Sequence, residues 1–185
     1  MKKYNVILAD PPWMYKHGGN GPARNHYGLE QTDAIAKLPI LSLSNPDSVL
    51  VLWATWPFLT DAFRVIEAWG FQYVTGMPWI KLQEQPWQDL WGDEHIKPTY
   101  GTGFWLRGCS EPILICKRGK AKPPKTNAVG LISERMEHSR KPDDIYEYCE
   151  GMPGPYLELF ARRRREGWDA FGNEVEGSIE LGVPV

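Results

Sequence analysis

The tetrapeptide Asp10-Pro11-Pro12-Trp13 is the stretch of the sequence best suited to chemistry. It directly follows the apolar run Val6–Ala9, which predicts a short buried strand. An acid at the carboxyl end of such a strand stands where open α/β sheets bind their ligands. The prolines lack backbone N–H groups, so the carbonyls here need partners outside a helix or a strand ladder. Carboxylate, carbonyl and aromatic face together suit a flat heterocycle with an amino group, although Asp-Pro is also a common opening of a turn.

A second group of polar residues follows two apolar runs near the end of the chain. Residues 157–161 and 168–172 predict neighbouring strands, joined by a run of four arginines. Glu174 comes soon after the second strand, where nucleoside-binding sheets place an acid on the ribose hydroxyls. Arg162 and Arg164 could grip a carboxylate, such as the amino-acid end of S-adenosylmethionine. A solvated basic loop and an ordinary surface acid are the alternatives.

Lys141 is the third candidate. It stands immediately before the helix start predicted at Pro142, which has Asp143 and Asp144 in its first turn. From there it could reach the strand ends and contact an anionic or carbonyl group, although an exposed lysine is the ordinary interpretation. All three candidates fall at predicted strand ends, so each strengthens the others.

The elements that must position these residues alternate between strands and helices. In order, we predict a strand at 6–9, a polar loop at 14–28, a helix at 30–37, a strand at 49–53, a helix at 57–69, strand-like pieces at 71–75 and 78–81, a long loop at 83–105, a strand at 112–117, a helix from 142, and strands at 156–161 and 168–172. This order predicts an α/β fold with a mostly parallel sheet and helices on both faces.

Composition limits the possible functions. The 185 residues suit one domain, 1–185, and 42% hydrophobic residues indicate a globular protein. A net charge of −2 supplies no general attraction for nucleic acid, so contacts must come from local patches such as the basic segment 117–122. Three cysteines without paired or metal-ligand spacing indicate reduced thiols, a cytoplasmic location and no metal site. We expect no signal peptide before Val6 and no membrane span.

The segments around these candidate residues resemble the MTA-seventy family of adenine-N6 methyltransferases. This family includes the catalytic subunit of the eukaryotic mRNA N6-adenosine methyltransferase. The blocks that carry the resemblance are Val6–Trp13, Tyr27-Gly28, Val51–Thr55, Trp79–Lys81, Thr102–Gly108 with Glu111, Ser139–Tyr146, Glu158–Arg162, Gly167-Trp168 and Gly172–Glu174. They extend over nearly the whole sequence, and their order makes chance similarity a poor explanation.

The resemblance implies a Rossmann-like methyltransferase sheet with permuted motif order, the catalytic tetrad first and the cofactor strands last. It implies S-adenosylmethionine as the cofactor, faced by Lys141, Arg162, Asn173 and Glu174, with Asp10 between the cofactor and the target base. The chain departs from the family in two ways. Relatives often carry glutamine or another polar residue in place of Glu174. They also have a segment before the first strand that closes the adenine pocket, where this sequence has only residues 1–5.

The resemblance also implies methyl transfer to the N6 amino group of adenine in nucleic acid, and the compact chain favours DNA over RNA. Asp10 and the carbonyl of Pro11 would accept hydrogen bonds from the amino group, and a base in a duplex would have to be flipped out. The remaining residues of the tetrad, Pro12 and Trp13, shape the site. The substrate-binding candidates are Tyr15, Tyr27, Lys81, Trp105 and Glu111.

Three other functions fit parts of this pattern. The first is a catalytically silent subunit that only binds nucleic acid, although such relatives lose the tetrad that is intact here. The second is methylation of cytosine N4, which poses the same chemical problem. The third is methylation of a small molecule or a protein. A small, slightly acidic monomer should bind nucleic acid weakly, so we also expect a homodimer or a partner subunit.

Overall fold

The computed structural model describes residues 2–13, 31–83, 87–88, 91, 93–101, 105–134, 140–172, 174–176, 179 and 181 of the chain. Residues 31–36 are helical. The other elements are β1 (Tyr4–Ala9), α2 (Ile40–Leu43), β2 (Ser44–Trp53), the 3-10 turn η1 (Trp56–Phe58), α3 (Leu59–Ala68), β3 (Gln72–Leu82), β4 (Trp87–Gln88), β5 (Glu94–His95), β6 (Ser110–Arg118), β7 (Leu131–Glu134), α4 (Asp144–Glu150), β8 (Tyr156–Leu159) and β9 (Trp168–Phe171).

Seven of these strands form one mixed sheet in the order β7-β3-β6-β2-β1-β8-β9. β1 lies between β2 and β8 and runs parallel to both, β9 runs parallel to β8, and β7 runs parallel to β3. β6 is antiparallel to both of its neighbours, β2 and β3. The predicted α/β class is confirmed, and β6 is the one strand of this sheet that runs opposite to the others.

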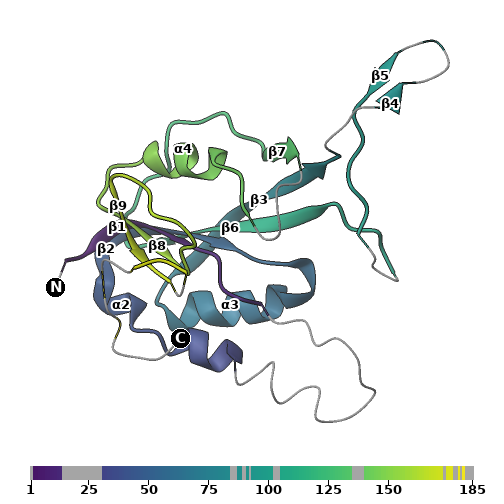
Figure 1. The fold of residues 1–185 in the computed structure, drawn as a ribbon. Helices are drawn as coiled ribbons and strands as arrows, with labels where there is room; N and C mark the ends of the chain where they lie inside the picture. Colours follow the sequence, from purple (N-terminus) through teal and green to yellow (C-terminus); the bar gives the residue numbers. More distant parts are fainter. Residues whose placement is uncertain are drawn as a thin grey trace, which may run out of the picture.

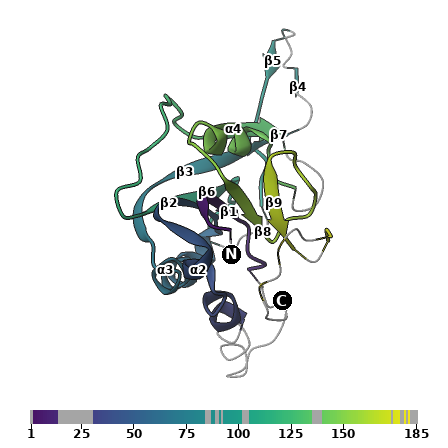
Figure 2. The same cartoon turned by 90° about the vertical axis from the view of Figure 1, so that its left-hand side faces the viewer.

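Helices cover both faces of this sheet, and the alternation of side chains in β1 explains why. Ile7 and Ala9 point into one core, where α3 packs through Ala62. Leu8 points into the other core, where α4 packs through Ile145. Figures 1 and 2 show α2 and α3 on one side of the sheet and α4 on the other. Each fully buried aliphatic side chain contributes about 1.5–3 kcal/mol. A run that is apolar at every position is therefore stabilised at both faces.

Three elements differ from the prediction. The pieces at 71–75 and 78–81 form one strand, β3, because Pro78 faces Pro112 in the ladder and neither residue needs to donate a hydrogen bond there. The described part of the 83–105 loop contains the hairpin β4–β5, which projects from the body of the molecule (Figures 1 and 2). β7 follows Gly130 as an unpredicted edge strand. No helix among the described residues is long and apolar enough to cross a membrane.

The turn after β8 has an unusual backbone. Phe160 has φ 62°, which is rare for a bulky residue and which bends the chain sharply at the strand end. Gly172 then approaches so closely that a Cβ atom would lie 2.2 Å from the carbonyl oxygen of Ala161. The Ala161 N–H donates to the carbonyl of Phe171 at 3.0 Å. These contacts bring the segments that follow β8 and β9 side by side.

Candidate active site

A cavity of about 310 Å³ lies at the carboxyl ends of β1, β8 and β2, beside the start of α4. This volume is at the lower end of the range for small-molecule sites. The cavity is lined by Leu8, Asp10, Trp53, Arg140, Lys141, Ile145, Tyr146, Glu158, Phe160, Arg162, Arg163 and Glu174. The sequence candidates at three separate strand ends and at the helix start therefore share one cavity.

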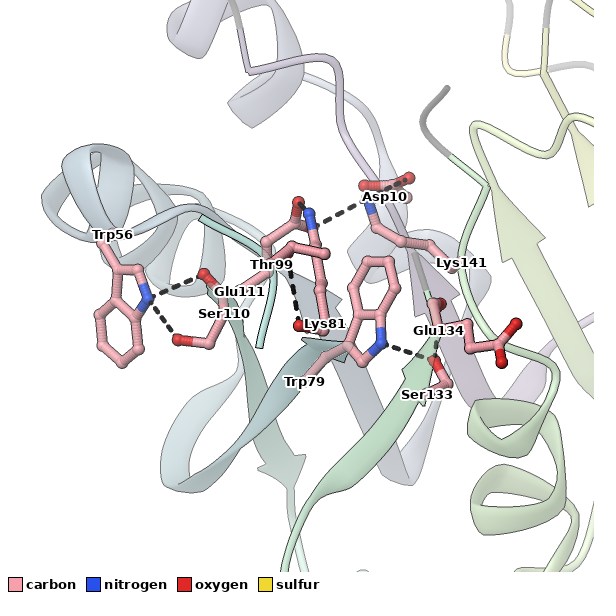
Figure 3. A network of polar contacts seen from close by, with 10 residues as sticks. All are labelled: Asp10, Trp56, Trp79, Lys81, Thr99, Ser110, Glu111, Ser133, Glu134 and Lys141. Carbon is pink, nitrogen blue, oxygen red and sulfur yellow. Dashed lines mark hydrogen bonds and ion pairs between the residues drawn. The ribbon is translucent and has the colours of Figure 1, made fainter. Parts of the chain in front are cut away.

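Asp10 is one end of a line of four alternating charges (Figure 3). The Lys141 ammonium lies 3.1 Å from Asp10 Oδ2 and 3.2 Å from Glu111 Oε2. The other oxygen of Glu111 accepts a hydrogen bond from Lys81. Lys141 also lies over the ring of Trp53 at 5.1 Å, a favourable position for a cation. β3, β6, the turn after β1 and the segment before α4 each supply one member of this line.

Burial and neighbouring charge set the ionisation of this line. Burial raises the pKa of Asp10, and the Lys141 ammonium only partly opposes it. Burial alone would lower the pKa of Lys141, but the Asp10 and Glu111 carboxylates raise it. The two lysines hold the pKa of Glu111 below its usual value in spite of burial. Lys141 therefore stays charged, and Asp10 is the member closest to accepting a proton.

The rest of the tetrad forms a fixed turn beside Asp10. The Trp13 backbone N–H donates to the carbonyl of Pro11 at 2.8 Å, which leaves this oxygen one further acceptor position. The Trp13 indole N–H donates to the carbonyl of Trp53 at 2.9 Å. Its ring stacks against Phe58, with 6.2 Å between the centroids. Pro11 is buried and Pro12 is exposed. The indole is thus held against the end of β2.

Each of the four arginines at 162–165 contacts a carboxylate or a backbone carbonyl of the protein itself. Arg162, which follows β8, lies 3.7 Å from Glu174, which follows β9. Arg163 forms an ion pair with Asp143. The Arg164 guanidinium donates to the carbonyl of Glu176 through Nε at 3.0 Å and Nη2 at 2.5 Å. Arg165 forms two hydrogen bonds with Glu150, at 2.8 and 3.1 Å. Arg162 lines the cavity, whereas Arg164 is used to hold the segment after β9.

The substrate-binding candidates have separate positions. Lys81 and Glu111 belong to the charged line beside Asp10. Trp105 is fully exposed, and nearby the Gly101 N–H donates to the Gly108 carbonyl. Tyr15 and Tyr27, like the cofactor candidate Asn173, lie outside the described residues.

Tyr146 and Glu158 line the cavity and were missing from the sequence candidates. The Tyr146 hydroxyl donates to both oxygens of Glu158, at 3.0 Å each. Burial raises the pKa of Glu158 to about 7, the Tyr146 hydrogen bond opposes this, and nearby Asp10 adds to it. One signal was available in the sequence, because Glu158 interrupts an otherwise apolar strand.

The basic segment 117–122 lies away from this site. Arg118 is opposite Ser48 in the β2–β6 ladder, while Ile113 is opposite Trp53 at the cavity end. Five residues of strand, roughly 17 Å, separate the two ends. Arg118 also donates to the carbonyls of Leu41, Ser44 and Asn45, so its role is to hold the chain. The expected phosphate-binding segment is therefore at the opposite edge of the sheet from Asp10.

The residues of the cavity suit S-adenosylmethionine. Lys141 and Arg162 offer cations for a carboxylate, and Glu174 offers an acceptor for a sugar diol at the end of β9. Asp10 and Glu158 offer negative charge toward a sulfonium and an ammonium. Among the described residues, no group of three His, Cys, Asp or Glu side chains is arranged to hold a metal ion.

Comparison with known proteins agrees with this chemistry. Residues 4–174 match the model of the MT-A70 family. The chain is 28% identical to the type II methyltransferase M.MunI of Mycoplasma sp, covering 97% of this chain and 82% of that protein. It is 30% identical to an N(6)-adenosine-methyltransferase MT-A70-like protein of Arabidopsis thaliana and 29% identical to the catalytic subunit METTL3 of Homo sapiens. These two matches cover 94% and 95% of this chain.

The chain spans only 24% and 29% of the length of these two eukaryotic relatives. The family match, in contrast, extends from β1 to the segment after β9 and so includes every strand of the main sheet. It also contains Asp10, Lys81, Glu111, Lys141 and Glu174, which are among the charged residues placed beside or within the cavity. The chain belongs to the MT-A70 family.

Proposed function

We propose that this protein transfers a methyl group from S-adenosylmethionine to the N6 amino group of adenine in nucleic acid, with DNA as the preferred substrate. The observation that carries the proposal is the position of Asp10. It directly follows strand β1, lines the cavity, and begins an intact Asp-Pro-Pro-Trp turn in a member of the MT-A70 family.

The adenine amino group is a weak nucleophile, because its lone pair is delocalised into the ring. Hydrogen bonds to the Asp10 carboxylate and to the remaining acceptor position of the Pro11 carbonyl orient it and favour a pyramidal nitrogen. Bound S-adenosylmethionine supplies a methyl group activated by a sulfonium. A new C–N bond forms as the S–C bond breaks, and the nitrogen then loses one proton. Since burial raises its pKa, the Asp10 carboxyl can receive that proton.

The other residues of the site bind and orient. Lys141 and Arg162 neutralise the carboxylate of the cofactor, and Glu174 accepts hydrogen bonds from its ribose. Glu111 keeps Lys141 charged and directed at the cavity. Lys81, on the far side of Glu111, faces the approaching nucleic acid. Alignment of the reacting atoms in such a site supplies much of the rate enhancement.

The preference for DNA rests on how much of each relative's length this chain matches. The type II methyltransferase M.MunI is matched over 82% of its length, whereas the human and Arabidopsis relatives are matched over less than a third. The match to the compact relative extends over most of that protein, without large additional regions. A homodimer or a partner subunit would enlarge the surface available to nucleic acid.

The test is mass spectrometry of nucleosides after incubation with S-adenosylmethionine and equal amounts of DNA and RNA. We expect N6-methyldeoxyadenosine in larger amount than N6-methyladenosine, and neither product with Asp10→Asn, which keeps the shape of the side chain. If N4-methylcytosine is the product, the target base is cytosine and the proposed adenine substrate is wrong. Absence of any methylated nucleoside from a preparation that binds the cofactor would contradict the proposal.

A further inference from the structure

Trp56 is an exposed aromatic residue near the proposed reaction centre, and the mechanism above does not use it. It is the third residue after β2, whose last residue, Trp53, lines the cavity. Three residues of chain reach at most about 10 Å, so Trp56 lies close to the cavity. It is not one of the described residues that line it. Trp56 is 52% exposed and, in the described part of the chain, belongs to neither core.

The indole of Trp56 is held in a fixed position despite its exposure. Its N–H donates to the carbonyl oxygen of Ser110 at 3.0 Å and to the hydroxyl oxygen of the same residue at 3.2 Å. Pro57 restricts the backbone of η1, and the Phe58 N–H donates to the carbonyl of Thr55 at 2.9 Å. A ring that is oriented before its ligand arrives loses little conformational freedom on binding.

Trp56 is anchored on the face of β6 opposite to the line of four charges. Leu114 of β6 points into the core that α3 covers, and Ser110 lies four residues before it, on the same face. Glu111, the next residue, points to the other face, toward Lys141. Figure 3 shows Ser110 and Glu111 between Trp56 and Asp10. The ring therefore lies on the α3 side of the sheet edge, away from the cavity.

The two faces of this edge suit the two substrates of a methyl transfer. The nucleophile and the departing sulfur must lie on opposite sides of the methyl group, in line. The cavity is lined by Ile145 and Tyr146 of α4, so a cofactor bound there occupies the α4 side of Asp10. The target base must then approach Asp10 from the other side, which is the side of Trp56.

An exposed indole in this position suits the nucleotide next to the target. A base that leaves the stack uncovers one face of the base beside it. Aromatic side chains bind such faces by stacking, and they tolerate different sequences because every base has a π face. Arg107, which is exposed and lies three residues before Ser110, offers a cation for a nearby phosphate.

We propose that Trp56, anchored by Ser110, stacks on the nucleobase next to the target adenine in the strand that is methylated. This inference rests on the proposed function, because it assigns a further contact to the same substrate. Trp13 is less suited to this contact. Its indole N–H is bound to the carbonyl of Trp53, and Phe58 stacks against its ring. Trp56 thus holds the strand on the side of Asp10 that the cofactor leaves open.

The test combines a change in the protein with a change in the nucleic acid. The probe is an oligonucleotide with one adenine that the wild type methylates, and in two further probes an abasic nucleotide replaces the 5′ or the 3′ neighbour of that adenine. For the wild type, one of the two abasic probes should have a KM about tenfold higher. Trp56→Ala should raise the KM of the intact probe by a similar factor, and that abasic nucleotide should then have no further effect. The kcat and the affinity for S-adenosylmethionine should stay within about twofold, because Trp56 lies outside the cavity lining.

Two further variants sharpen this measurement. Phe63→Ala is the matched control, since Phe63 is 42% exposed and meets the edge of Tyr73, at the opposite end of β3 from the Ser110 partner Ile80. It should leave the KM of every probe unchanged. Trp56→Phe keeps an aromatic ring and should retain part of the difference between the intact and abasic probes.

Two outcomes would overturn the stacking contact while leaving the proposed function intact. One is that Trp56→Ala raises the KM of the intact and both abasic probes by the same factor, which would mean that the ring supports the fold of the site without touching a base. The other is that the KM does not change in Trp56→Ala. If the wild type methylates no oligonucleotide, the proposed function itself fails. Thermal unfolding of each variant shows whether the fold is kept.

Discussion

The two halves of the sheet, on either side of β2, differ in how they treat charged and aromatic side chains. On the β1–β8–β9 side, charged residues line a cavity and almost all contact an oppositely charged partner. On the β6–β3 side, the region that includes the β4–β5 hairpin carries exposed aromatic residues such as Tyr100, which is 65% exposed, and Trp105. The first half is suited to a small charged ligand. The second half presents apolar surface that suits a larger partner.

The halves meet at the line of four charges. Lys141 and Asp10 belong to the cavity, whereas Glu111 and Lys81 belong to β6 and β3. If the two halves of the sheet have these separate roles, substitutions on the cavity side should alter cofactor binding. Substitutions on the hairpin side should alter nucleic-acid binding, and substitutions in the line of four charges should alter catalysis.

The largest effect should follow substitution of Asp10. We expect Asp10→Asn to reduce kcat by at least about 100-fold with a smaller change in KM, because it removes a charge that acts mainly in the transition state. The fold should remain, since Lys141 keeps Glu111 as a partner. Steady-state methylation kinetics measure the effect, and near-normal kcat would exclude the assigned role.

The next largest effect should follow removal of a charged side chain that lines the cavity. Lys141→Ala and Glu174→Ala should each weaken S-adenosylmethionine binding by about 1–3 kcal/mol. The loss should be larger for Lys141, whose side chain is only 18% exposed between two acids, than for Glu174, whose side chain is 62% exposed. Calorimetry measures both. Unchanged affinity in both variants would show that the cofactor binds elsewhere.

On the hairpin side, the double change Tyr100→Ala and Trp105→Ala should weaken nucleic-acid binding by about 10-fold, because stacking contributes roughly 1–3 kcal/mol per base. Cofactor affinity should not change. The matched control is Tyr73→Ala, an exposed tyrosine opposite Cys116 at the other edge of the sheet. Fluorescence anisotropy with labelled oligonucleotides measures the difference, and equal effects of both variants would break the comparison.

Cofactor affinity should also depend on pH through Glu158. Its pKa of about 7 means that roughly a tenth of the carboxyl is ionised at pH 6 and about three quarters at pH 7.5. Binding of a cation requires the ionised form, so affinity for S-adenosylhomocysteine should rise about eightfold over this interval. Calorimetry should show a flatter profile for Glu158→Gln.

The other titratable groups near Glu158 must be considered before this pH dependence is assigned to Glu158. Tyr146 and Cys149 on α4 stay neutral, since burial raises the pKa of both. Arg165 stays charged. Asp10, directly after β1, also has a raised pKa and retains its own contribution in the variant. Folding raises the pKa of Glu158, so the wild type loses stability as pH rises toward 7. Glu158→Gln should therefore be the more stable protein at pH 8, by up to about 3 kcal/mol, and not at pH 4.5.

The smallest effect should come from the basic segment. Replacing Lys117, Lys120 and Lys122 with alanine should change nucleic-acid affinity less than about twofold at physiological salt, because this edge of the sheet is opposite the site. Arg118 is left in place, since its guanidinium donates hydrogen bonds to three backbone carbonyls. A large loss of affinity, with a reduced salt dependence, would mean that the nucleic acid extends around the molecule to this edge.

The sequence alone determined the features that depend on neighbouring residues. Asp10 directly follows an apolar run, Lys141 precedes a proline that opens a helix, and Glu174 follows the last strand. Because parallel strands bring their carboxyl ends to one edge, these local signals were sufficient to predict that the three residues would meet. They now line one cavity.

Only the tertiary structure decided the features that depend on pairing between distant residues. β6 runs antiparallel to β2, which brings Glu111 to Lys141 and carries Lys117 to the opposite edge. No local pattern contains this direction, because an apolar strand reads the same in both orientations. The partners of Arg164 and Glu158 are likewise set by how β8, β9 and α4 pack together. Side-chain chemistry is local, but the partner that each charge receives is a property of the whole fold.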